Sequence, residues 1–197
     1  MKKIIILTIL IFLSKIAYAD NKVFSIVQVN NQTITNLDVN DEIKIIKIFY
    51  RDQIKLENLN QIAINNLIIK IIKDEEIKKN NIAVNEKLIN NEYQKILDEI
   101  KKNNSISKSL ETKIYNKIKI DLEWVVLIKK KFSWRVDINM DEINEKIKDN
   151  KSNNLQKDKD KLIIVEKNKK IEVYAQSYLE NLKKNSLIKY FKWKKKF

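Results

Sequence analysis

The side chains that could support chemistry in this chain are carboxylates, and several of them occur in adjacent pairs. The pairs are Glu75-Glu76, Asp98-Glu99 and Asp141-Glu142. Two carboxylates at a suitable separation can act as acid and nucleophile or base, as they do in glycoside hydrolysis. Each pair also falls within a helical pattern, where acidic residues are ordinary solvated residues or first-turn residues favoured by the helix dipole. We therefore assign these pairs no catalytic role.

Other familiar catalytic chemistries are excluded by composition. The 197 residues contain no His, Cys, Gly or Pro. No thiol or imidazole can act as a nucleophile, general base or metal ligand, and no glycine-rich loop can hold a phosphate group. The excess of Lys, Asn and Ile indicates an AT-rich coding genome, which inflates the basic charge. We expect a protein that is not an enzyme and that uses no cofactor and no metal.

Residues 1–19 are typical of a secretory signal peptide. Lys2-Lys3 supplies the positive start, Ile4 to Leu13 the apolar run, and Ala17-Tyr18-Ala19 the cleavage pattern. We expect cleavage between Ala19 and Asp20, a periplasmic location, and a net charge that falls from +14 to +11 with the loss of three lysines. The apolar run is shorter than the roughly 20 residues that span a membrane. An uncleaved membrane anchor is the lesser alternative.

The segment from Ser25 to Val39 organises the rest of the chain. Alternation of apolar and polar residues from Ser25 to Val29 predicts a strand, and Asn30-Asn31 is a turn dipeptide suited to φ > 0. Thr35 and Asp38 have the spacing of a helix cap with an acidic residue in the first turn. We expect a β-hairpin that leads directly into a helix and on which the later helices pack.

The remaining chain predicts a mainly α domain. Asn81 is the expected left-handed residue that ends the second and most central helix. Asn85 and Asn139 are expected to cap the helices that begin at 86 and 140. Trp134 to Ile138 is expected to be extended, 149–161 to be a charged linker, and Leu162 to Val165 to be a short strand. The expected helices cover about 36–50, 57–79, 86–100, 108–132 and 140–148, with a last helix from about 170 through Tyr190.

Four segments, in this order, resemble the SurA/PpiD/trigger-factor chaperone superfamily. The first is V-N-N-Q-T-I-T-N-L-D-V at Val29 to Val39, and the second runs from Leu67 through Val84-Asn85-Glu86. The third is R-V-D-I-N-M-D-E-I at Arg135 to Ile143. The fourth, Ala175 to Tyr190, is similar to the C-terminal helix that packs back on the N-terminal domain in SurA.

This resemblance implies a SurA N-domain-like helical chaperone domain at 20–148, completed by a returning segment at 162–197. The residues between them, 149–161, stand where SurA carries parvulin-type isomerase domains and are too few to form one. Asn31 and Asn81 replace the family's hairpin and helix-ending glycines, which Asn can do at modest cost. The resemblance therefore implies a chaperone module without prolyl isomerase activity.

For such a module the resemblance implies an apolar groove that binds unfolded or partly folded outer-membrane or periplasmic proteins without ATP. The alternative for each aromatic candidate is ordinary core packing, although Trp134 is expected to be the most exposed. The expected basic rim is Lys129, Lys130, Lys131 and Arg135. The candidates for the apolar lining are Phe49, Tyr50, Tyr93, Trp124, Phe132 and Trp134.

Three other interpretations remain open at this point. The same groove in an adaptor or assembly subunit would bind one fixed protein partner, and an uncleaved signal would make a membrane-anchored, PpiD-like chaperone. The basic charge also suits peripheral contact with an anionic membrane surface. Nucleic acid is not an expected partner, because the chain has an export signal and no DNA- or RNA-binding motif.

Overall fold

The computed structural model describes residues 22–50, 58–101, 106–148 and 155–191. The described part is mainly helical with a small N-terminal β-hairpin, as the sequence predicts. The predicted signal peptide, with Ala19 and Asp20 at its cleavage site, lies outside the described residues. So do residues 51–56, where the sequence predicts a connection between two helices, residues 149–154 of the predicted linker, and the basic tail at 192–197.

The hairpin forms where the alternating pattern predicts it. Strand β1 (Ser25–Val29) pairs antiparallel with β2 (Gln32–Thr35), and Val29 lies opposite Gln32 across the turn. Asn30 takes the left-handed backbone conformation with φ 50°, which Asn tolerates better than other side chains. The predicted turn dipeptide is confirmed, and the positive φ lies at Asn30 rather than at Asn31, the residue that the resemblance places at the hairpin glycine.

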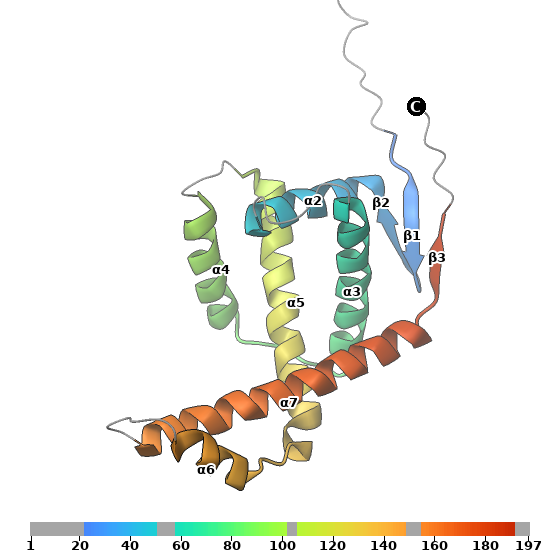
Figure 1. Ribbon diagram of the computed structural model, residues 1–197. Coiled ribbons are helices and arrows are strands. Elements are labelled where there is room, and N and C mark those ends of the chain that lie inside the picture. Colours follow the sequence, from blue (N-terminus) through green and yellow to red (C-terminus); the bar gives the residue numbers. More distant parts are fainter. Residues whose placement is uncertain (1–21, 51–57, 102–105, 149–154, 192–197) are drawn as a thin grey trace, which may run out of the picture.

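Neighbouring helices stand side by side, and another helix crosses one end of two of them (Figure 1). Helix α3 (Leu59–Lys79) lies between the hairpin and α5 (Lys108–Phe132), and α4 (Glu86–Lys101) packs on the other side of α5. Helix α2 (Asn36–Tyr50) crosses one end of α3 and α5. Because α3 contacts the hairpin, α2, α5 and α7, its apolar residues are distributed around the helix, as the sequence predicts for a central helix.

The C-terminal third differs from the prediction. Helix α7 covers Leu155–Asn185, so the predicted strand at Leu162 to Val165 lies within a helix, as do residues 155–161 of the predicted linker. Four apolar residues are too few to distinguish a strand from a helix, and no Gly or Pro interrupts this segment. Its residues also follow helical spacing: Leu162 and Ile163 are half-buried, whereas the next two side chains are exposed.

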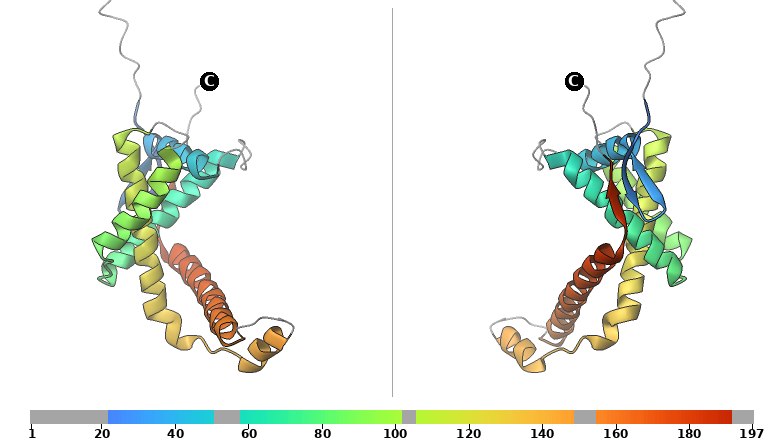
Figure 2. Two further views of the ribbon diagram at one scale, coloured as in Figure 1. Left: turned by 90° about the vertical axis from the view of Figure 1, so that its left-hand side faces the viewer. Right: turned by 90° about the vertical axis from the view of Figure 1, so that its right-hand side faces the viewer.

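The last helix ends earlier than predicted and returns the chain to the hairpin. Strand β3 (Ile188–Tyr190) pairs antiparallel with β1, giving a sheet of order β2-β1-β3, so Tyr190 lies in a strand rather than in the helix. Before it reaches β3, helix α7 packs on α3 and α5. Figure 2 shows α7 running from the short helix α6 (Met140–Lys148) to β3 beside the hairpin. The prediction that the C-terminal helix completes the N-terminal domain is confirmed.

One local prediction between α5 and α6 is also wrong in part. Residues Ser133–Arg135 form a 3₁₀ turn, so the segment from Trp134 is not extended until it reaches Val136. The turn directly continues the last turn of α5, which is a common way for an α-helix to end. The predicted cap at Asn139 is confirmed, because its side-chain oxygen accepts the backbone N–H of Asp141 at 3.0 Å.

Candidate functional site

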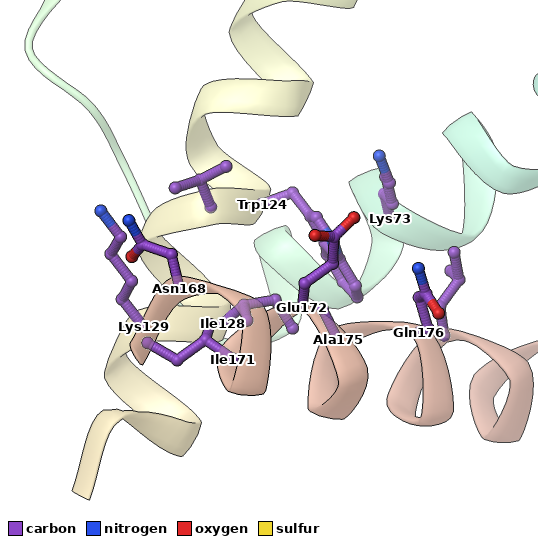
Figure 3. Close-up of a pocket in the computed structure, with 11 residues that line it drawn as sticks. Lys73, Trp124, Ile128, Lys129, Asn168, Ile171, Glu172, Ala175 and Gln176 are labelled. Atoms are coloured by element: carbon purple, nitrogen blue, oxygen red, sulfur yellow. The ribbon is translucent and has the colours of Figure 1, made fainter. Parts of the chain in front are cut away.

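A groove of about 490 Å³ lies between the second half of α5 and the middle of α7, with α3 beside it. Figure 3 shows the side chains of the three helices that face it. Helix α3 contributes Lys73 alone. Helix α5 contributes Trp124, Val125, Ile128 and Lys129, and α7 contributes Asn168, Ile171, Glu172, Ala175, Gln176 and Leu179.

The groove has an apolar floor and a polar rim. Trp124 and Ile128 lie one helical turn apart on α5 and are 6% and 3% exposed, and Ile171 of α7 is 8% exposed. Along the rim, Lys129, Glu172 and Gln176 are exposed. Val125, at 47% exposed, extends the apolar surface out to the rim. The floor is thus fixed by packing while apolar side-chain surface remains open to a ligand.

Aromatic side chains behind the groove hold α7 against α5. The rings of Trp124 and Tyr178 are stacked with centroids 6.1 Å apart. Phe132 stacks on Tyr174 at 5.6 Å and meets Tyr178 edge-on at 5.4 Å. Such ring pairs stabilise packing beyond the area that they bury. These residues position the groove wall.

A buried carboxylate joins the same three helices. Glu76 of α3 is 7% exposed and accepts hydrogen bonds from Tyr178 Oη at 2.5 Å and from Asn80 Nδ2 at 2.6 Å. Lys131 Nζ of α5 lies 3.4 Å from the same Glu76 oxygen and 5.1 Å from the centroid of the Tyr178 ring. A buried charge needs such partners, and here they come from α3, α5 and α7.

These contacts shift the pKa values of the cluster. Burial alone would raise the pKa of Glu76, but hydrogen bonds from Tyr178, Asn80 and Lys131 outweigh it and hold that pKa below its ordinary value. Burial and donation to the Glu76 carboxylate raise the pKa of Tyr178. The hydrogen bond with Tyr178 raises the pKa of Lys131. Glu76, Tyr178 and Lys131 therefore form charge-assisted contacts that join α3, α7 and α5.

The structure does not bring the six predicted groove residues together. Of the six, Trp124 alone lines the groove. Phe132 packs behind it, and Trp134 is 73% exposed on the 3₁₀ turn, as expected. Phe49 and Tyr50 are exposed at the end of α2. Tyr93 of α4 packs edge-on against Tyr115 at 5.3 Å, in a separate apolar cluster with α2 and α5.

The predicted basic rim divides into residues with different roles. Lys129 lines the groove and Lys130 is exposed beside it. Lys131 is instead tied to Glu76. Arg135 lies over the rings of Phe132, at 5.8 Å, and Trp134, at 4.7 Å. Cation–π contacts of this kind stabilise the 3₁₀ turn at the end of α5.

The predicted groove residues include none from the α7 side of the groove. Ile171, Ala175 and Leu179 recur every four residues and form one apolar stripe on the helix. This spacing was an available signal for a face that packs on another helix. The predicted helix began too late to include Asn168, and single-helix patterns do not show which helix lies opposite.

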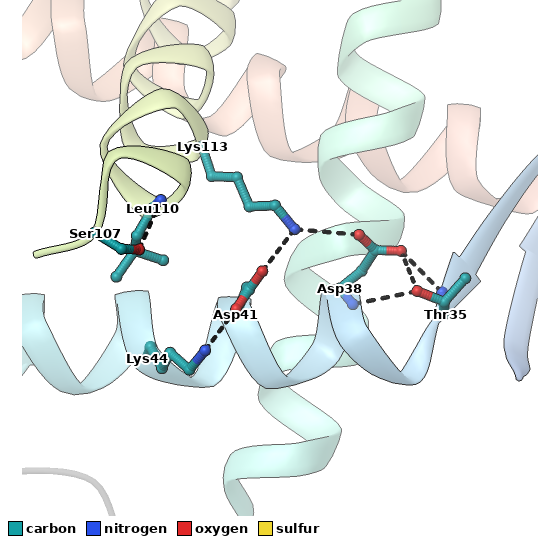
Figure 4. Close-up of polar contacts among 7 residues, drawn as sticks. All are labelled: Thr35, Asp38, Asp41, Lys44, Ser107, Leu110 and Lys113. Carbon is teal, nitrogen blue, oxygen red and sulfur yellow. Dashed lines mark hydrogen bonds and ion pairs between the residues drawn. The ribbon is translucent and has the colours of Figure 1, made fainter. Parts of the chain in front are cut away.

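A second charged cluster, at the far end of α5, is structural. Thr35 and Asp38 cap α2 as predicted, because Thr35 Oγ1 accepts the Asp38 N–H at 3.3 Å and Asp38 Oδ2 accepts the Thr35 N–H at 3.0 Å (Figure 4). Lys113 of α5 reaches Asp38 at 3.3 Å and Asp41 at 2.9 Å. Despite partial burial, the hydrogen bonds to Thr35 and Lys113 lower the pKa of Asp38. This cluster fixes α5 to the start of α2.

Comparisons with known proteins add no family assignment. No protein-family model matches the chain, and the search of curated proteins finds no match. Within the described residues, no helix has the length and apolar character needed to cross a membrane. The same residues contain no group of three or more acidic side chains placed to hold a metal ion. The resemblance to the chaperone superfamily therefore stays a prediction.

Proposed function

We propose that this protein binds unfolded or partly folded envelope proteins through the α5–α7 groove and limits their aggregation without ATP. The observation that carries the proposal is the open apolar surface of the groove, with a packed floor of Trp124, Ile128 and Ile171 and a polar rim. Its volume of about 490 Å³ lies within the range of about 300–1,000 Å³ typical of ligand sites. The motif resemblance to SurA-type chaperones supports the same proposal.

An extended polypeptide is the occupant that best fits this surface. The groove follows two helices, and its lining changes from Lys129 and Asn168 at one end to Lys73 and Gln176 at the other. An unfolded outer-membrane protein offers alternating apolar and polar side chains. Apolar side chains would contact the floor while polar side chains and backbone groups meet the rim. Binding and release would depend on weak contacts alone and would need no catalysed step.

Val125 and Val126 provide a matched test of the groove. Val125 lines it, whereas the adjacent Val126, 41% exposed on the same helix, does not. We expect the mature protein to delay the aggregation of an unfolded outer-membrane barrel diluted from urea, measured by light scattering. V125D should lose most of this effect, because it places a carboxylate on the apolar surface that the client must cover. V126D should behave like the wild type.

Two outcomes would contradict the proposal. One is a wild-type protein that does not delay aggregation, and the other is an equal loss in V125D and V126D. Repeating the assay with several unrelated unfolded barrels separates a general chaperone from an adaptor. A general chaperone should protect all of them, whereas an adaptor should protect one cognate protein. Circular dichroism of both variants, whose substituted side chains are exposed, checks that each remains folded.

A further inference from the structure

A second, smaller pocket of about 170 Å³ lies between α3 and α5, directly beside the groove. Lys73 lines both cavities. The lining residues of this pocket lie in the middle of α3 and α5, on the α2 side of the groove. Helix α7 instead packs on α5 nearer to the C-terminal end of that helix. The residues that line the pocket are Asn66, Ile69, Lys70, Lys73, Lys117, Ile120 and Asp121.

The charge of this pocket is unbalanced. Its one carboxylate, on Asp121, pairs with Lys73 at 2.8 Å. Lys70 and Lys117 have no ion pair within the part of the chain that the structure describes. Glu42, the acid whose charge acts most strongly on Lys70, accepts a hydrogen bond from Asn66 at 3.1 Å. The pocket therefore presents two ammonium groups that an anion would neutralise.

The surroundings of Lys70 favour an anionic ligand. Lys70 is half-buried, and burial together with the positive charges of Lys117 and Lys113 lowers its pKa despite Glu42. A carboxylate brought between Lys70 and Lys117 would gain charge-assisted hydrogen bonds in a partly dehydrated site. Ile69 and Ile120 also line the pocket and give it apolar surface beside the two lysines.

We propose that Lys70 and Lys117 bind a carboxylate side chain of the same polypeptide whose apolar residues occupy the α5–α7 groove. This inference rests on the proposed function and names its preferred clients, which are apolar segments followed closely by Asp or Glu. The shared residue Lys73 places this anion-binding pocket at one end of the groove. In this proposal one extended segment occupies both cavities.

The test uses two fluorescein-labelled peptides that share one apolar, alternating sequence and end in either Asp-Asp or Asn-Asn with an amidated C-terminus. Fluorescence anisotropy gives the dissociation constant of each peptide with the mature protein. We expect the Asp peptide to bind about tenfold more tightly, the gain typical of a charge-assisted hydrogen bond. In K70Q/K117Q this preference should disappear, while affinity for the Asn peptide stays unchanged.

The control variant is K79Q/K87Q. Lys79 and Lys87 are exposed at the end of α3 and the start of α4, outside both cavities, and their replacement lowers the net charge equally. This variant should keep the tenfold preference. If it loses the preference as K70Q/K117Q does, the general positive field attracts the peptide and the pocket inference is wrong.

Failure of the inference differs from failure of the proposed function. If the wild type binds neither peptide, the groove itself does not hold polypeptides. If it binds both peptides equally, the proposed function of the groove is retained and the proposed anion-binding pocket is wrong. A last experiment measures binding of each variant to phosphatidylglycerol vesicles. If K70Q/K117Q loses vesicle binding and K79Q/K87Q does not, while both keep the preference for the Asp peptide, the lysines bind lipid phosphate and the inference is wrong.

Discussion

Glu76 and Glu123 are both buried, yet folding shifts their pKa values in opposite directions. Three donors lower the pKa of Glu76 despite its burial. Burial raises the pKa of Glu123, and its partners, Lys119 at 3.9 Å and the Val84 backbone N–H, do not offset that effect. Glu76 is therefore held as a carboxylate that joins three helices, whereas the charge on Glu123 opposes folding.

This contrast predicts different effects of two Glu→Gln variants. Because folding lowers the pKa of Glu76, its ionised form contributes stability above its ordinary pKa of 4.5, and that stability is lost as pH falls through the lowered value. E76Q should lower the free energy of unfolding at pH 7 by about 1–2 kcal/mol, since a charge-assisted contact becomes neutral. It should also flatten the acid dependence below pH 4.5.

For Glu123 the sign is reversed. Folding raises the pKa of this carboxyl, so its contribution to stability is greatest at low pH and is lost as pH rises through the raised value. E123Q should therefore slightly raise the free energy of unfolding at pH 7, because an amide oxygen can still accept the Val84 N–H. Urea denaturation of both variants between pH 3 and pH 8 measures these effects. Equal losses at pH 7 would contradict the assignment.

At the scale of elements, asparagine takes the left-handed position at the end of α3, where a glycine is usual, because the chain has no glycine. Helix α3 ends at Lys79, and Asn81 follows with φ 50°. The N–H groups of Asn81 and Ile82 donate to the carbonyls of Lys78 and Ile77 at 3.1 Å. These bonds satisfy carbonyls at the helix end that would otherwise lack partners.

Replacing Asn81 should show how much of this turn depends on the left-handed conformation. An ordinary L-residue in that conformation costs roughly 1–2 kcal/mol and Asn costs less. We expect N81A to lower the free energy of unfolding by about 1 kcal/mol. N81G should leave it unchanged or raise it by a few tenths of a kcal/mol. Thermal or urea unfolding of both variants measures this difference, and equal destabilisation by both would show that the side chain matters instead.

The same local signals explain which elements the sequence could predict. The caps at Thr35, Asn85 and Asn139 are short-range patterns, and each lies where predicted. The first turns of helix α7 are not predicted, because residues 155–161 carry almost no apolar side chains and so show no apolar periodicity. Polar and charged residues instead contact each other one turn apart along the helix, as in the hydrogen bond from Gln156 to Asp160 at 3.1 Å and the ion pair of Lys169 with Glu166 at 3.2 Å.

At the scale of the whole molecule, the site depends on contacts between residues far apart in sequence. Trp124 was predicted because it is an aromatic on an apolar helix face. Its partner Tyr178 was not predicted as part of the site, because stacking across α5 and α7 requires α7 to fold back. The lysine pocket has the same origin, since Lys70 and Lys117 meet only through the packing of α3 on α5. Single-element patterns carry none of this information.

The return of the C-terminal segment to the hairpin can be tested by cross-linking, because the chain has no native cysteine. Gln28 and Lys189 are directly opposite each other on β1 and β3. Facing residues in antiparallel strands have Cα atoms about 4.5–5.5 Å apart, within disulfide range. We expect Q28C/K189C to form an intramolecular disulfide on oxidation, seen by non-reducing gel mobility. The bond should raise the free energy of unfolding by about 2–4 kcal/mol, because it closes a long loop.

The control for this experiment is T33C/K189C. Thr33 pairs with Gln28 from β2, on the opposite side of β1, so it is two strands away from Lys189. Two strand spacings are about 9.5 Å, beyond the reach of a disulfide without backbone movement. This variant should stay monomeric and reduced under the same oxidation. Equal cross-linking of the two variants, or of neither, would mean that β3 does not lie on β1. The position of α7, and with it the groove that α7 forms with α5, would then lose its anchor at the sheet.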